Sequence, residues 1–174
     1  QVLGGFPESL LGGLPEAGTR LMDRYMPLAS RIGADLSFDR FYFLGSGMRY
    51  GLACEANLKM KEMSLTHSEP FHFLEFRHGP MSMVNRDTVV VGLLSDRNYH
   101  AEAKVLAEMQ ALGGRTVSLA ETQAEVEFQS GIPEYARLVL YLPILQLMAF
   151  FRSTAKGYNP DRPKNLSAVV HLDF

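Results

Sequence analysis

Three charged side chains recur at helical spacing in the first half of the chain. Glu55, Lys59 and Glu62 are four and three residues apart, so a helix through them would place all three on one face. Burial can raise a glutamate pKa from about 4.3 towards neutrality, where the carboxylate can both take and return a proton. Glu62 is therefore a candidate general base. The alternative is an ordinary ion pair with Lys59, which this spacing also favours.

A second candidate for proton transfer follows this helix. His78 stands in the turn sequence Arg77-His78-Gly79-Pro80, which can hold an imidazole rigidly, and histidine titrates near neutral pH. The alternative is a structural histidine that bonds to the loop backbone. His67, His72 and His78 are five and six residues apart and have no cysteine partner, so we expect no metal site.

A glycine-rich loop precedes the charged helix. Gly45, Ser46 and Gly47 follow a short apolar run, and a helix N-terminus directly after them could hold an anion. The spacing to Gly51 is one residue too long for a dinucleotide-binding loop, and a close turn is the alternative. Ser46 and Gly47 are candidate substrate-binding residues because ligands of α/β sheets sit at the carboxyl ends of strands.

The elements that must position these residues alternate between apolar strands and helices. We expect strands at 41–44, 88–94, 116–119 and 138–142, and a further short strand at 68–73. We expect helices at 7–13, 15–33, 49–65, 99–112 and 143–156, with a helical turn at 73–77. In the helix 49–65, the packing face should consist of Ala53, Ala56, Met60 and Met63. The alternation predicts an α/β fold, a three-layer α/β/α sandwich with a mostly parallel sheet.

The bulk properties limit the class of protein. A length of 174 residues fits one domain, here divided into an N-terminal helical segment (1–36), the main domain (37–158) and a C-terminal tail that closes the site (159–174). The net charge of −2 gives no basic surface for nucleic acid or acidic membranes. The chain begins at Gln1 rather than Met, which indicates a fragment or a processed form.

Two further features indicate a cytoplasmic location. Cys54 is the only cysteine, which excludes an intramolecular disulfide and suits a reducing compartment. The start of the chain has no basic segment leading into an apolar run, as a signal peptide would. The apolar run 138–151 contains Pro143 and Gln146 and is shorter than the roughly 20 residues of a membrane span, so we interpret it as a buried strand and helix.

Three motifs occur in one order along the chain. They are Glu55-x-x-x-Lys59-x-Lys61-Glu62, then His67-Ser68-Glu69, and the turn Arg77-His78-Gly79-Pro80. In this order they resemble the sugar isomerase (SIS) domain family, and in particular the second SIS domain in the isomerase half of glucosamine-6-phosphate synthase and its relatives. The resemblance extends over residues 41–172. It implies the flavodoxin-like SIS fold.

The resemblance also implies a function. These enzymes move a proton between C1 and C2 of a hexose or aminohexose 6-phosphate without a metal or organic cofactor. Glu62 would be the base and His78 the group that assists ring opening, commonly in the active site of the neighbouring subunit, so a homodimer is expected. Glu55 and Lys59 match positions near the substrate. A missing N-terminal SIS half would hold the phosphate of the phosphosugar.

One departure from the family lies in the tail. Residues 161–169 resemble a C-terminal loop in which the synthase has a Schiff-base lysine, and Ala168 stands at that position. Alanine cannot form an imine. Lys164 matches a different, basic position. We therefore expect an isomerase, an aminosugar-phosphate deaminase or a deglycase rather than the complete synthase, and the alternative is a non-catalytic module that senses phosphosugars.

Overall fold

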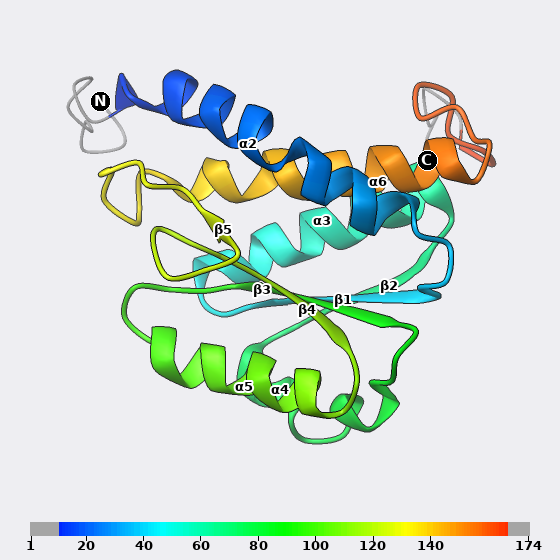
Figure 1. Ribbon diagram of the computed structural model, residues 1–174, viewed down its shortest axis with the longest axis horizontal. Helices are drawn as coiled ribbons and strands as arrows, with labels where there is room; N and C mark the ends of the chain where they lie inside the picture. The colour runs from blue at the N-terminus through cyan, green and yellow to red at the C-terminus, as the bar shows by residue number, and fades with distance from the viewer. Residues whose placement is uncertain (1–10, 167–174) are drawn as a thin grey trace, which may run out of the picture.

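Five parallel strands form the centre of the molecule, in the order β2-β1-β3-β4-β5 (Figure 1). The computed structural model describes residues 11–166. The strands are β1 (Arg40–Gly45), β2 (His67–Phe71), β3 (Thr88–Leu93), β4 (Arg115–Ala120) and β5 (Val126–Glu127). The helices are α2 (Leu14–Ala34), α3 (Met48–Ser64), α4 (Phe73–Phe76), α5 (Tyr99–Ala111) and α6 (Leu142–Ala155), with 3₁₀ turns η1 (Pro80–Met83) and η2 (Leu138–Tyr141). The predicted α/β sandwich is confirmed.

Helices cover both faces of the sheet. Phe41 and Phe43 of β1 pack into one core with α2, α3 and α6, whereas Tyr42 and Leu44 pack into a second core with α4 and α5 (Figure 1). Both faces being buried explains why β1 and β3 are continuous apolar runs rather than alternating patterns. The two layers therefore place α3 on one side of the sheet and α4 on the other.

Two strand predictions differ from the structure. The strand expected at 138–142 is wrong, because Leu138–Tyr141 form the 3₁₀ turn η2 that leads directly into α6. A short apolar run can be a buried strand or a buried helix, and periodicity alone does not separate them. The two-residue strand β5 was missed, because two residues are too few to show the alternation of side chains that indicates a strand. The helix expected at 7–13 lies largely outside the described residues.

Helix α6 is the most apolar helix of the described chain. By length and composition, the 18-residue stretch Leu138–Ala155, of mean hydropathy 1.5, meets the requirement for a membrane span. In this fold, however, Ile144, Leu145 and Met148 are buried in the core that α6 forms with α2 and α3. A buried core helix satisfies the same criteria of length and hydropathy.

The crossing of α2 and α6 depends on a glycine. A Cβ atom on Gly33 would lie 2.4 Å from the backbone oxygen of Met148 in α6. We expect Gly33→Ala to lower the free energy of unfolding by about 1–3 kcal/mol, because backbone cannot move aside as a side chain can. Gly18→Ala in the same helix meets nothing within 4 Å and should instead stabilise by about 0.4–1 kcal/mol. Urea denaturation of both variants checks this, and equal stabilities would contradict the close crossing.

Candidate active site

The charged face of α3 has the geometry that its spacing predicts. The Nζ atom of Lys59 lies 3.1 Å from Oε2 of Glu62 and 3.7 Å from Oε1 of Glu55. The hydrogen bond to Glu62 is the main reason why the pKa of Lys59 is raised, so this side chain stays protonated. The three side chains are 32–38% exposed, whereas the opposite face of the helix is buried through Ala53 and Met60. One ammonium thus bridges two carboxylates at the surface of the domain.

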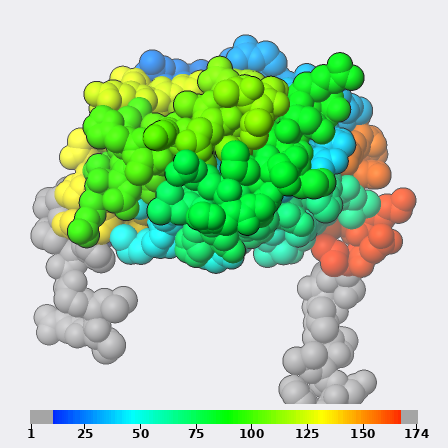
Figure 2. All heavy atoms as spheres, turned by 90° about the horizontal axis from the view of Figure 1, so that it is seen from below, coloured from blue at the N-terminus to red at the C-terminus, as the bar shows by residue number. Residues whose placement is uncertain are grey.

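His78 lies on the loop between α4 and η1. Its backbone N–H donates to the carbonyl oxygen of Glu75 at 2.9 Å, and Gly79 follows with a φ of +137°, which favours glycine. The imidazole is exposed and lines a hollow of about 520 Å³ with Leu74, Arg77, Met81 and Glu108. This face of the molecule, made by α4, η1 and α5, is the one seen in Figure 2.

Within one chain, the two candidate acid–base groups lie on opposite faces of the sheet. Glu62 belongs to α3, which packs on the face of Phe41 and Phe43. His78 follows α4, which packs on the face of Tyr42 and Leu44 (Figure 1). A single chain therefore does not bring Glu62 and His78 together.

Ser46 lies at the carboxyl edge of the sheet, where β1 and β3 are neighbours. Its Oγ accepts a hydrogen bond from the backbone N–H of Phe73 at 3.4 Å. The next residue, Gly47, is the N-cap of α3 and has a φ of +59°. Ser46 lines a cavity of about 250 Å³. The strand order reverses at this point, which is the usual ligand position in open α/β sheets. Ser46 therefore lies beside a cavity at this edge of the sheet, and substrate binding by Ser46 and Gly47 stays a prediction.

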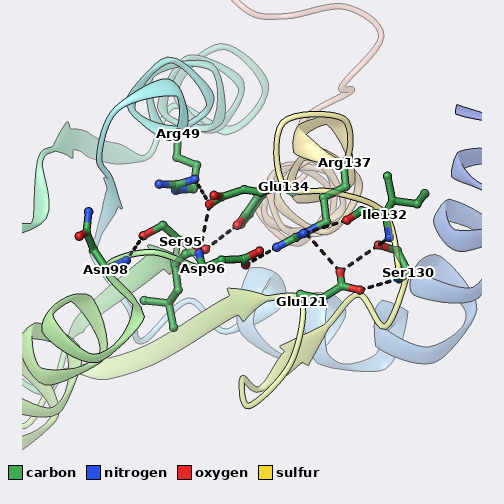
Figure 3. Close-up of polar contacts among 12 residues, drawn as sticks. Arg49, Ser95, Asp96, Asn98, Glu121, Ser130, Ile132, Glu134 and Arg137 are labelled. Atoms are coloured by element: carbon green, nitrogen blue, oxygen red, sulfur yellow. Dashed lines mark hydrogen bonds and ion pairs between the residues drawn. The ribbon is translucent and has the colours of Figure 1, made fainter. Parts of the chain in front are cut away.

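Sequence reasoning missed a network of ion pairs at the same edge (Figure 3). Arg49 of α3 pairs with Glu134, whose carboxylate also accepts the backbone N–H of Asp96 at 3.1 Å. The buried Arg137 pairs with Asp96, and its Nε lies 3.2 Å from Oε2 of Glu121. The network ties the segment before η2 to the ends of β3 and β4. Asp96 and Glu121 each follow an apolar strand closely, and that position was the available signal.

The C-terminal tail is described only in part. Ala168, which stands at the position of the family's lysine, lies outside the described residues. The ammonium of Lys164 lies 5.9 Å from the centre of the Tyr158 ring, so it contacts an aromatic face of the tail itself. Within residues 11–166, His, Cys, Asp and Glu side chains do not gather in the groups of three or more that could hold a metal ion.

Comparison with known proteins identifies relatives over most of the chain. The chain is 33% identical over 153 residues to the glutamine–fructose-6-phosphate aminotransferase (isomerizing) of Sulfurisphaera tokodaii, which covers 84% of this chain and 25% of that protein. The protein of the same name from Pyrococcus horikoshii is 27% identical over 180 residues, covering 99% and 29%. The chain thus spans about a quarter of the length of the curated relatives it matches.

Solved structures share the fold. Glucosamine-6-phosphate deaminase from Thermotoga maritima matches with a TM-score of 0.79 and 25% identity, over 98% of this chain and 52% of that one. Tagatose-6-phosphate ketose/aldose isomerase from Escherichia coli matches with a TM-score of 0.73 and 21% identity, over 92% and 46%. The family model for the SIS domain matches residues 37–145 of the chain. Together with the five-stranded parallel sheet, these matches show that the chain belongs to the SIS domain family.

Proposed function

We propose that this chain is the C-terminal SIS half of an enzyme that moves a proton between C1 and C2 of a hexose or aminohexose 6-phosphate. The observation that carries the proposal is the charged face of α3, with Lys59 held 3.1 Å from Glu62 and 3.7 Å from Glu55. Relatives named as isomerising aminotransferase, glucosamine-6-phosphate deaminase and ketose/aldose isomerase support this class of reaction.

In this mechanism, Glu62 is the proton carrier. Its carboxylate takes the proton from the carbon next to the carbonyl group, which leaves an enediol- or enolamine-like intermediate, and then returns the proton to the neighbouring carbon. Lys59 stays cationic because of its raised pKa, so it orients the side chain of Glu62 or contacts a substrate hydroxyl. Glu55, on the other side of Lys59, binds a substrate hydroxyl in the same way. A positioned base of this type contributes about 10²–10⁴-fold to the rate.

The exposure of this face indicates what else the site needs. Glu62 is 32% exposed, so water still solvates its carboxylate, whereas electrostatic interactions in an active site are strongest where water is excluded. A covering domain would remove the water. The chain spans about a quarter of the length of its relatives. We therefore propose that a preceding SIS half covers the charged face of α3 and binds the phosphate of the phosphosugar. Cys54, a single thiol, accords with a cytoplasmic enzyme.

We propose that His78 acts in the site of a second copy of the chain. The opposite placement of α3 and α4 on the sheet supports this arrangement, because one chain separates His78 from Glu62. A two-fold dimer would present each exposed His78 to the partner's substrate, where the imidazole would assist opening of the sugar ring. The lining of its hollow by Leu74 and Met81 offers apolar surface for such a contact.

A second candidate function is a sensor that binds phosphosugars without turnover. Ala168 in place of a lysine favours it. A sensor, however, has less need of both Glu62 and His78 than an enzyme has. Among the enzymes, the same substitution favours isomerase, deaminase or deglycase over synthase, because no imine can form at Ala168.

The test is hydrogen exchange in deuterated water with the longest natural form of the protein. Glucosamine 6-phosphate, fructose 6-phosphate and a fructosamine 6-phosphate are the substrates, and NMR follows deuterium at C1 and C2 while an ammonia assay follows released amine. We expect deuterium in at least one substrate, and amine release then separates deaminase or deglycase from isomerase. Saturable binding without exchange would contradict the enzyme and support the sensor.

A further inference from the structure

The cavity at the carboxyl ends of β1 and β3 is separate from the charged face of α3. It has a volume of about 250 Å³ and lies where the strand order reverses. Its walls come from three places in the sequence. Ser46 follows β1, and Phe73 and Leu74 belong to α4. Asn98 directly precedes α5, and Ala101 and Glu102 lie in the first turn of that helix.

Glu102 gives this cavity its chemistry. The residue is 3% exposed, and Oε2 accepts a hydrogen bond from the backbone N–H of Ser95 at 2.6 Å. The other oxygen, Oε1, is buried and has no hydrogen-bond partner in the described part of the chain. Burying a carboxylate oxygen without a hydrogen-bond partner costs free energy. Binding of a ligand that donates a hydrogen bond to Oε1 would therefore be favoured.

The other walls favour a small hydroxylated ligand. Ser46 accepts a bond from the Phe73 N–H and keeps its own hydroxyl proton to donate. Asn98 offers both an amide donor and an acceptor, and Phe73 with Leu74 forms an apolar wall. The volume lies below the roughly 300–1,000 Å³ of pockets for drug-sized ligands. The cavity is large enough for one sugar ring.

The lining disfavours phosphate. None of the residues around the cavity is Lys or Arg. An anion would therefore lie beside the carboxylate of Glu102 without a compensating cation, and like charges at close range in a buried site repel strongly. An ammonium group has the opposite preference, because it both donates hydrogen bonds and neutralises the carboxylate.

We propose that this cavity is a binding site for a small hydroxylated amine, of which an unphosphorylated amino sugar is the simplest example. Its ammonium contacts Glu102, and its hydroxyls contact Ser46 and Asn98. Binding at this site does not require proton transfer by Glu62. An experiment can therefore refute the site without refuting the proposed enzyme activity.

Isothermal titration calorimetry with glucosamine, on the longest natural form of the protein, tests the site. Glu102→Gln removes the charge but keeps an oxygen for the Ser95 N–H, and it should weaken glucosamine binding at least tenfold. Ala101→Leu, on the exposed side of α5, should block the cavity without touching the core, and it decides the outcome if Glu102→Gln does not fold. Glu125→Gln, a surface carboxylate paired with Arg115, is the control and should bind as the wild type does.

Two results separate this site from the alternatives. Glucosamine should bind at least tenfold more tightly than glucose. Inorganic phosphate should not compete. Competition by phosphate, equal affinity for glucose and glucosamine, or full binding by both Glu102→Gln and Ala101→Leu would overturn the proposal.

Discussion

Glu62→Gln should lower the exchange of deuterium between water and the C1 or C2 position of the substrate by about 10²–10⁴-fold, the contribution of a positioned general base. The amide has nearly the same shape as the carboxylate, and it can still accept a hydrogen bond from Lys59. It cannot accept the substrate proton. Substrate affinity should therefore change little, while the rate of exchange falls.

Glu55→Gln is the matched control for this variant. Both carboxylates contact the same ammonium, at 3.7 Å for Glu55 and 3.1 Å for Glu62. If Glu55 only binds the substrate, Glu55→Gln should raise KM and leave kcat nearly unchanged. Such an interaction stabilises the ground state and the transition state equally. Equal losses of kcat in the two variants would contradict the assignment of the base to Glu62.

Arg152→Met should lower the free energy of unfolding by about 3–5 kcal/mol, as the loss of a buried charged group that satisfies several partners does. Arg152 is 3% exposed. It donates to the carbonyl oxygens of Asp35 and Phe38 before β1, and to Oγ1 of Thr66 before β2 at 3.2 Å. Methionine fills the space but removes the donors from the carbonyl oxygens of Asp35 and Phe38, whereas Oγ1 of Thr66 keeps its bonds from Lys156 at 2.7 Å and Ser64 at 2.9 Å.

Chemical denaturation with two controls measures this effect. Arg31→Met removes an exposed arginine from α2 and should change stability by less than about 0.5 kcal/mol. Arg152→Lys keeps the charge but cannot reach three acceptors in different directions, so it should recover only part of the loss. A stability of Arg152→Met within 1 kcal/mol of the wild type, on the scale of one hydrogen bond, would contradict the role of Arg152 as a tether.

The sequence predicts the elements that carry a strong local pattern. Helix α3 was expected at 49–65 and spans Met48–Ser64, because its apolar and charged residues repeat at helical intervals. Strand β3 was expected at 88–94 and spans Thr88–Leu93, because a β-branched run buried on both faces has few alternatives. The charged face of α3 follows from the same periodicity, so the pairing around Lys59 was predictable too.

Contacts between distant segments were not predictable in this way. Arg49 and Glu134 are 85 residues apart, and Arg137 and Asp96 are 41 apart, so no local spacing relates them. The free oxygen of Glu102 likewise depends on how the loop after β3 folds back to the start of α5. The separation of His78 from Glu62 by the sheet follows from the strand order, which the sequence motifs do not encode.

Complementation between two inactive variants tests most directly whether the proton-transfer site is shared between two chains. Glu62→Gln and His78→Ala, each in the longest natural form, are mixed and allowed to exchange subunits, and native mass spectrometry confirms the heterodimer. In a two-fold dimer, one site of each heterodimer regains both groups, so the mixture should recover about a quarter of the wild-type exchange rate. Heterodimers with no more activity than the separate variants would contradict the shared site.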